Sequence, residues 1–129
     1  MTDPGAEFVA ALAAKDTDRL LAVLAPSVEF RGMTPGRFWE ASTAEAAVHE
    51  VLYRWFEPSD VVEDVRSVET GAVVDRHRVD YRLVVRNEDG RHLVEQRAYY
   101  DLDDDGRIAR MHAVCAGFRP LAPGPEEHR

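Results

Sequence analysis

Residues 59–118 alternate apolar and polar side chains with a period of two, and this pattern restricts the chain to folds that contain a large antiparallel sheet. The turn sequences ETG, NEDG and DDDG interrupt the alternation. Strands are therefore predicted near residues 60–69, 73–87, 91–102 and 107–118. Because strands joined by such short turns pair with each other, the second half of the chain is predicted to be an antiparallel meander.

The first 58 residues show the longer period of helices instead. Asp3 is a predicted N-cap before a proline in the first helical turn, and a second short helix is predicted between the cap at Asp16 or Thr17 and Pro26. A strand is predicted in VEFRGM, followed by the turn-rich connector TPGRFWEA.

A third helix is predicted to open on the capping box formed by Ser42 and Glu45 and to end at Pro58. Of the aromatic residues near its end, Trp55 is interpreted as core packing rather than as part of a pocket mouth. Helices followed by a strongly bent sheet give an α+β domain in which the sheet wraps around three N-terminal helices.

Length and charge bound the class of protein. A chain of 129 residues with 45% hydrophobic content suits one domain, predicted over residues 1–119, with a flexible C-terminal tail at 120–129. The net charge of -8 repels phosphate backbones and anionic membranes, so neither nucleic acid nor a membrane is an expected partner. The chain has no apolar run long enough to span a bilayer and no signal peptide at its start, which predicts a cytoplasmic protein.

The basic residues are arginine in fifteen of sixteen cases, which we interpret as the codon bias of a GC-rich bacterial genome. The single cysteine, Cys115, excludes an internal disulfide and is interpreted as a small buried residue. The five histidines lack metal-ligand spacing, and the calcium-loop-like DLDDDGRIARMH has His112 where a glutamate is needed. We expect neither a metal nor a cofactor.

The order of two helices, the strand VEFRG, a third helix and long hairpins ending in DGRIARMHAVCAGF resembles the nuclear transport factor 2-like superfamily over about residues 5–118. SnoaL-like polyketide cyclases, ketosteroid isomerases and limonene epoxide hydrolases belong to it. The resemblance implies a cone in which the concave sheet and the helices enclose one pocket. It also implies dimerisation through the convex face of the sheet.

The segment Arg78-Val79-Asp80 resembles the RVD segment that carries a catalytic arginine and aspartate in limonene epoxide hydrolases. Their other functional positions do not carry over, because their tyrosine and asparagine align with Phe30 and Gly32, and their second aspartate aligns with Ala113. The tyrosine and two aspartates of ketosteroid isomerases fall on Phe8, Ala98 and Phe30, so the resemblance does not extend to that isomerase chemistry.

The turn NEDG suits a type I turn with Gly90 in the left-handed position, which predicts that Asn87 pairs with Arg91. Counting back from this pair defines a predicted concave face; the resemblance adds its last three residues. Its members are Arg78, Asp80, Arg82, Gln96, Ala98, Tyr100, Met111, Ala113 and Cys115. Because Ala98, Ala113 and Gly32 are too small to fill the space, we expect a polar cavity there.

The opposite, convex face then carries a mostly apolar row made of Val79, Tyr81, Leu83, Val85, Leu93, Tyr99, Ile108 and Val114. An exposed patch of this kind predicts a homodimer through the convex sheet. The alternative is a β-bulge that shifts the register by one residue, which would put the valines in the core and the charged side chains in water.

Two functions of different classes remain open. The first is a cofactor-independent cyclase, isomerase or epoxide hydrolase acting on a polyketide-like, carbonyl or epoxide substrate, with Asp80 as base and Arg78 as the electrophilic clamp. The second is a non-catalytic ligand-binding or dimerisation module of the same fold. In either case the expected ligand-binding side chains are Arg82, Gln96, Tyr100, Phe30, Trp39, Met111 and Cys115. The sequence does not decide whether the chain is an enzyme.

Overall fold

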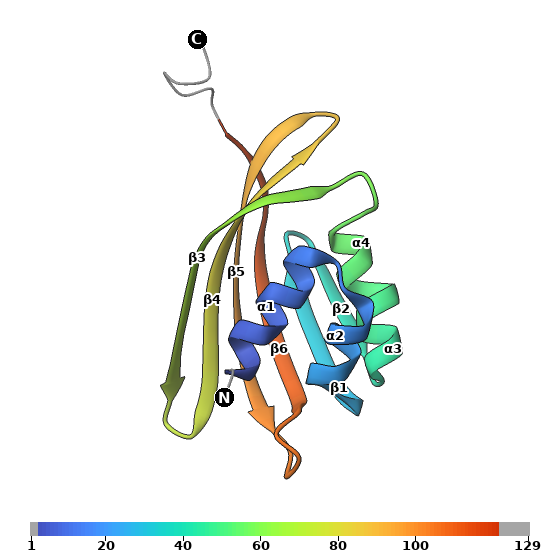
Figure 1. Cartoon of the computed structure of the whole chain (residues 1–129), viewed down its shortest axis with the longest axis vertical. Helices are drawn as coiled ribbons and strands as arrows, with labels where there is room; N and C mark the ends of the chain where they lie inside the picture. Colours follow the sequence, from blue (N-terminus) through green and yellow to red (C-terminus); the bar gives the residue numbers. More distant parts are fainter. Residues whose placement is uncertain (1–2, 122–129) are drawn as a thin grey trace.

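The computed structural model describes residues 3–121 as an α+β domain in which helices cover one face of a curved sheet (Figure 1). The predicted fold class is therefore confirmed, while most of the predicted tail lies outside the described residues. The helical segments are α1 (Pro4–Ala14), α2 (Thr17–Val23), α3 (Ala44–Ala46), the π-helical η1 (Ala47–Leu52) and α4 (Tyr53–Trp55). The strands are β1 (Leu24–Thr34), β2 (Arg37–Ala41), β3 (Val61–Val73), β4 (Arg76–Asn87), β5 (Gly90–Leu102) and β6 (Ile108–Pro120).

Side-chain caps start the helices near the predicted positions. The Asp3 carboxylate accepts hydrogen bonds from the backbone N–H groups of Gly5 and Ala6, at 2.9 and 3.1 Å, which confirms the first predicted cap. The third helix is capped by Thr43, whose hydroxyl accepts from Ala46 N, and not by the predicted Ser42. This helix passes through η1 before it ends at Trp55.

The sheet has the strand order β2-β1-β6-β5-β4-β3. It is mixed rather than purely antiparallel, because β1 runs parallel to β6. The predicted connector 34–41 was wrong in part: it contains β2, which forms a hairpin with β1 through a turn that places Gly36 at a φ of 78°. The predicted ETG turn was also wrong, because β3 continues through it and the chain reverses only at Val74, which has a φ of 59°.

The hairpin between β4 and β5 is one residue shorter than predicted. Asn87 pairs with Gly90, so the loop is Glu88-Asp89 and not Glu88-Asp89-Gly90. The Asn87 side chain accepts a hydrogen bond from Asp89 N at 2.9 Å and closes the turn locally. Because side chains alternate along a strand, this shift of one residue moves every side chain of β4 to the face opposite the predicted one.

The predicted inner face was therefore wrong for β4. Its apolar row lies against the helices and is almost fully buried: Val79, Tyr81, Leu83 and Val85. Arg78, Asp80 and Arg82 lie on the outer face. This outcome is the alternative in which the valines form the core, although it arises from the shorter loop rather than from a bulge. The predicted row of exposed valines that suggested a convex dimer interface does not exist.

The predicted inner residues of β5 and β6 were correct, but Ile108 at the start of β6, predicted on the convex face, is fully buried beside a register shift between β5 and β6. Gln96, Ala98 and Tyr100 on β5, and Met111, Ala113 and Cys115 on β6, are all buried on the helix side of the sheet. Among residues 3–121, no helix has the length and apolar character needed to cross a bilayer.

The two faces of β4 predict opposite effects for neighbouring substitutions. Leu83→Ala removes a fully buried side chain and should lower the free energy of unfolding by about 2–5 kcal/mol. Arg82→Ala removes an exposed partner of Glu95 and should lower it by less than about 1 kcal/mol. Urea denaturation followed by circular dichroism measures both values. If Arg82→Ala were the more damaging change, the assignment of the faces would be wrong.

Candidate functional site

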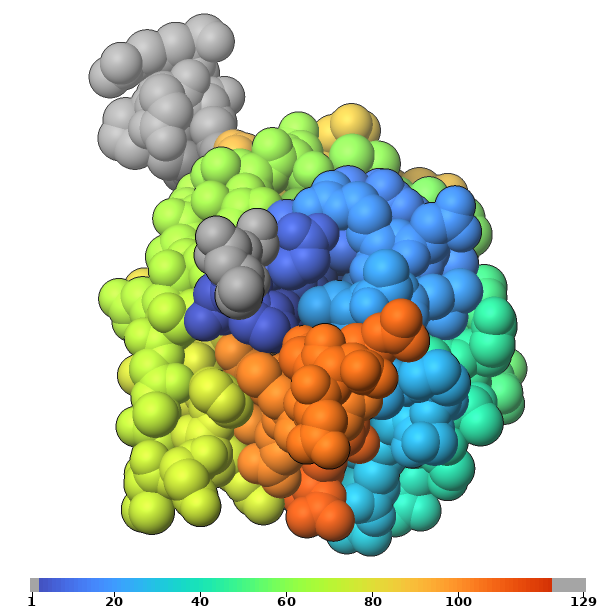
Figure 2. Space-filling model, turned by 60° about the horizontal axis from the view of Figure 1, so that its bottom comes forward, coloured from blue at the N-terminus to red at the C-terminus, as the bar shows by residue number. Residues whose placement is uncertain are grey.

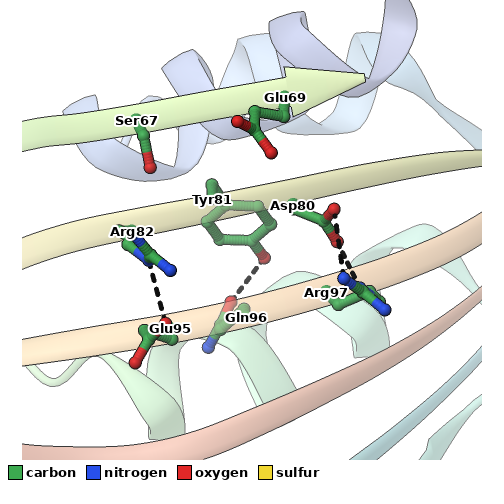
Figure 3. A pocket seen from close by; sticks show the side chains of 8 residues that line it. All are labelled: Ser67, Glu69, Asp80, Tyr81, Arg82, Glu95, Gln96 and Arg97. Atoms are coloured by element: carbon green, nitrogen blue, oxygen red, sulfur yellow. Dashed lines mark hydrogen bonds and ion pairs between the residues drawn. The ribbon is translucent and has the colours of Figure 1, made fainter. Parts of the chain in front are cut away.

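The predicted catalytic pair lies on the outer surface of the sheet. Asp80 accepts hydrogen bonds from both Arg78 and Arg97, and the side chains of Arg78 and Asp80 are 25% and 19% exposed. The hydrogen bond from Arg97 to Asp80 raises the pKa of Arg97. Figure 3 shows this contact next to a second outer pair, Arg82 and Glu95, whose atoms are 2.9 Å apart.

A hollow of about 260 Å³ lies beside these charged side chains. It is lined by Ser67, Glu69, Asp80, Tyr81, Arg82, Glu95, Gln96 and Arg97. The Asp80 carboxylate is already bound by two guanidinium groups, which leaves it poorly suited to accept a proton from a substrate. The placement of Arg78, Asp80 and Arg82 inside a cone pocket was therefore wrong.

The inner face of the sheet carries a different polar pair. The Tyr81 hydroxyl donates a hydrogen bond to Gln96 Oε1, from β4 to the directly opposite residue of β5 (Figure 3). Burial, with a smaller contribution from the nearby Cys115 thiol, raises the pKa of Tyr81 well above its usual range. The phenol therefore stays protonated, and it fixes the Gln96 amide with its Nε2 group free to donate elsewhere.

Three buried nitrogen atoms of the described residues have no hydrogen-bond partner: Trp55 Nε1, His92 Nδ1 and Gln96 Nε2. Their residues are only 7%, 8% and 4% exposed. Leaving a buried donor unpaired costs about 1–3 kcal/mol, so each such group requires a reason. His92 and Gln96 share the inner face of β5, and Trp55 packs on the same face of the sheet from α4.

The Trp55 indole occupies the space that small residues leave on the sheet. A Cβ atom added to Gly32 would lie 2.5 Å from two carbon atoms of the indole. The indole also contacts the rings of Phe30 and Trp39, with centroids 6.0 and 6.2 Å apart. The space predicted to be a polar cavity around Gly32, Ala98 and Ala113 is thus filled at Gly32 by a tryptophan.

A surface cavity of about 310 Å³ opens beside Trp55, between the segment after α4 and the β4–β5 turn. It is lined by Trp55, Glu57, Ser59, Asp60, Asn87, Glu88, Asp89 and Phe118. Phe118, which lines this cavity, also packs against two buried rings: its centroid lies 5.9 Å from that of His92 and 5.8 Å from that of Phe56. We call this cavity the mouth.

Backbone and side-chain hydrogen bonds hold the rim of the mouth. Asp60 accepts from Glu57 N at 2.8 Å and from Asn87 Nδ2 at 2.9 Å, so it links the segment after α4 to the β4–β5 turn. The Lys15 ammonium donates to the carbonyl oxygens of Glu57 and Asp60, both at 2.5 Å. Burial lowers the pKa of Lys15, and the nearby Asp60 partly offsets this effect.

The remaining predicted ligand-binding residues serve mostly in packing or in local hydrogen bonds. Tyr100 hydroxyl accepts from Gly5 N at 3.1 Å and contacts the Asp3 carboxylate, and burial together with Asp3 raises the pKa of Tyr100 to about 12. Trp39 Nε1 donates to Thr34 Oγ1 at 2.8 Å. Phe30 and Met111 are fully buried.

Arg37 and Cys115 have local partners as well. The Arg37 guanidinium stacks 3.6 Å from the centroid of the Trp39 ring. Cys115 is buried and its sulfur accepts from Gly117 N at 3.4 Å. Among the described residues, no three histidine, cysteine or acidic side chains are arranged to hold a metal ion.

Sequence reasoning identified Gln96 correctly as an inner residue but missed Trp55 and His92 as parts of the site. His92 could have been found, because it lies in the same alternating phase as Gln96 and Ala98. The orientation of Trp55 over Gly32 depends on how the third helix packs on the sheet, and periodicity does not determine it.

Comparisons with known proteins support the fold and not a specific activity. No protein-family model matches the chain, and no curated protein matches it either. A candidate isomerase from Rhodopseudomonas palustris has a TM-score of 0.68 at 14% identity, covering 89% of this chain and 91% of its own. An NTF2-like protein from Burkholderia thailandensis has a TM-score of 0.64 at 18% identity, covering 89% and 92%.

A third solved structure, an LEH-like epoxide hydrolase from M. tuberculosis, has a TM-score of 0.62 at 17% identity and covers 87% of this chain and 79% of its own. At such identities the agreement concerns the arrangement of helices and strands alone. The predicted resemblance in fold is confirmed. The chain has the nuclear transport factor 2-like fold found also in SnoaL-like proteins.

Proposed function

We propose that the chain binds a small, neutral and mostly apolar molecule that carries an acceptor oxygen. The binding position is the inner wall between Trp55 and Gln96, reached from the mouth. The observation that carries this proposal is the group of three buried nitrogen atoms without partners on the helix side of the sheet. A ligand oxygen that accepts from the Trp55 and Gln96 donors would remove the desolvation cost that these two groups carry in the free protein.

The chemistry of these nitrogens defines the ligand class. An indole N–H is a donor only, and the amide nitrogen of a glutamine is also a donor, so Trp55 and Gln96 both require an acceptor. A carbonyl, hydroxyl or epoxide oxygen fits this requirement. The aromatic rings of Phe56 and Phe118 favour an apolar body next to the oxygen.

The mouth selects against anions. Four of its lining residues are acidic: Glu57, Asp60, Glu88 and Asp89. Negative charge at the entrance repels carboxylates and phosphates. The ligand is therefore not an anion, in contrast to the anionic ligand that an inward-facing arginine row would have favoured.

The fold neighbours are consistent with such a ligand. One of them is an epoxide hydrolase and another is a candidate SnoaL-like polyketide cyclase from Mesorhizobium loti. Both names imply substrates with epoxide or carbonyl oxygens, which are acceptors of the kind that Trp55 and Gln96 require.

A second candidate function is acid/base catalysis on the same molecule, and it depends on His92. Its Nδ1 atom is buried without a partner, and imidazole is the side chain that most readily exchanges protons near neutral pH. His92 replaces Asp80 as the candidate base in this proposal, because Asp80 is bound by two arginines on the outer face.

Trp55→Phe should abolish binding, because it removes the N–H that donates to the ligand. The free protein should lose no hydrogen bond in this variant, because that N–H has no partner there. The matched control is Trp39→Phe, which removes a donor bonded to Thr34 and should cost about 1 kcal/mol of stability while binding persists. The measurement is ligand-induced thermal stabilisation with a panel of neutral aromatic ketones and epoxides, and with the corresponding carboxylic acids as charge controls. Stabilisation by the acids alone, or an unchanged response of Trp55→Phe, would reject the proposal.

If the chain is an enzyme, His92→Gln should retain binding of the neutral ligands while turnover falls at least about 100-fold, the usual effect of removing a general base. The same panel of ketones and epoxides is followed for product formation. Asp80→Asn serves as the control and should retain turnover. Activity lost in Asp80→Asn but retained in His92→Gln would instead return the base to the outer face.

A further inference from the structure

The strand β3 forms one edge of the sheet, and within residues 3–121 no other strand pairs with that edge. It is the last strand in the order, and Figure 1 shows no element beyond it. In Figure 2 the yellow-green atoms of β3 and β4 likewise form one side of the molecule. A free edge presents unpaired backbone N–H and C=O groups, which make it a template for another strand.

The second half of β3 lacks the devices that usually protect such an edge. The register shifts against β4 occur at residues 62–64 and 65–67, whereas residues 67–73 pair with β4 without interruption. This regular segment, SVETGAV, contains no lysine and no proline, and its only charged side chain is Glu69. Val68 and Val73 are 38% and 50% exposed. An exposed, regular and largely uncharged edge is expected to be covered.

The outer face of this segment has complementary charges. Glu69 and Gly71 lie on the same face, opposite Asp80 and Arg78 of β4. The Arg78 guanidinium lies over Gly71, with Nη2 2.5 Å from the position that a Cβ atom would take there. Within the described part of the chain, Glu69 makes no ion pair.

We propose that a second copy of this chain pairs with this edge, β3 against β3 in antiparallel orientation, with Thr70 at the two-fold axis. In this register Glu69 of one protomer lies opposite Gly71 of its partner, and hence beside the arginine that covers that glycine. The contact occurs twice because the pair is symmetric. On the inner face, Val68 lies opposite Ala72 of the partner, and the two copies of Thr70 face each other, a favourable cross-strand pair.

The second copy is favoured over an unrelated strand because the segment is complementary to itself in this one register. Shifting the pair by one residue moves Glu69 away from the arginine and disrupts the match between the faces. An edge of seven residues alone buries less surface than a standard interface, so the dimer should depend on protein concentration.

A pair of cysteine variants tests both the interface and its register. Directly opposite residues in an antiparallel pair have Cα atoms about 4.5–5.5 Å apart, within the range of a disulfide. Thr70→Cys should therefore form an intermolecular disulfide in a glutathione redox buffer. Ala72→Cys lies on the same face, but its two copies would be about 13 Å apart along the strands, so it should not cross-link.

Non-reducing electrophoresis of the full chain reads out the result, with the unmodified chain and its buried Cys115 as the baseline. Cross-linking of Thr70→Cys but not of Ala72→Cys supports the proposal. Cross-linking of both, of neither, or of Ala72→Cys alone overturns it.

The native mass distinguishes this edge from the other exposed apolar patch, which consists of Met33, Phe38 and Val114 across β1, β2 and β6. Light scattering over a dilution series should show a mass rising from 14.5 kDa toward twice that value. Val68→Lys should hold the chain at the monomer mass at every concentration, while Phe38→Ser should leave the rise unchanged. A rise that is lost in Phe38→Ser but retained in Val68→Lys would assign the interface to the other patch and overturn the proposal, as would a monomer at every concentration.

Discussion

The turn at Glu88 and Asp89 determines which side of the sheet becomes the core. Its two-residue length pairs Asn87 with Gly90 and thereby sets the phase of β4 against β5. With this phase, the row from Val79 to Val85 packs under the helices and the interleaved charges form ion pairs on the outside. Burying four large apolar side chains stabilises the folded state by several kcal/mol. Burying the two arginines and the aspartate instead would carry a desolvation penalty much larger than their electrostatic attraction. The hydrophobic effect and the turn therefore favour the same register.

The sequence was sufficient for the class of fold and for most element positions, because these follow from periodicity and caps. Together with the family resemblance, it also identified the inner residues of β5 and β6 apart from Ile108. It failed at β4, where a single glycine can either end a three-residue loop or begin the next strand. Gly90 does have a positive φ of 109°, as the turn signal predicts, yet it still pairs with Asn87. The turn signal at Gly90 was thus correct about the backbone conformation but did not determine the strand register. Because the register differed by one residue, the predicted site residues of β4 lie on the opposite face of the sheet.

The interior is not purely apolar, because it contains both paired and unpaired polar atoms. Tyr81 and Gln96 satisfy each other across β4 and β5, and the orientation of the amide leaves one donor free. Trp39 and Trp55 illustrate the contrast: both indoles pack together, but the Trp39 nitrogen has a partner in Thr34 and the Trp55 nitrogen has none. Such differences depend on side-chain orientation, which neither composition nor spacing encodes, and the proposed binding position rests on them.

The contact between Lys15 and the rim has a consequence for the thermodynamics of ligand entry. Since one ammonium group holds two carbonyl oxygens of the segment after α4, and Asp60 joins that segment to the β4–β5 turn, the entrance is already ordered in the unliganded molecule. Within residues 3–121, no segment has to fold over this entrance, so the binding that we propose would carry little entropic penalty from loop ordering. In the proposed binding, discrimination at this entrance would rest on a preorganised shape and on its negative potential, rather than on closure after capture.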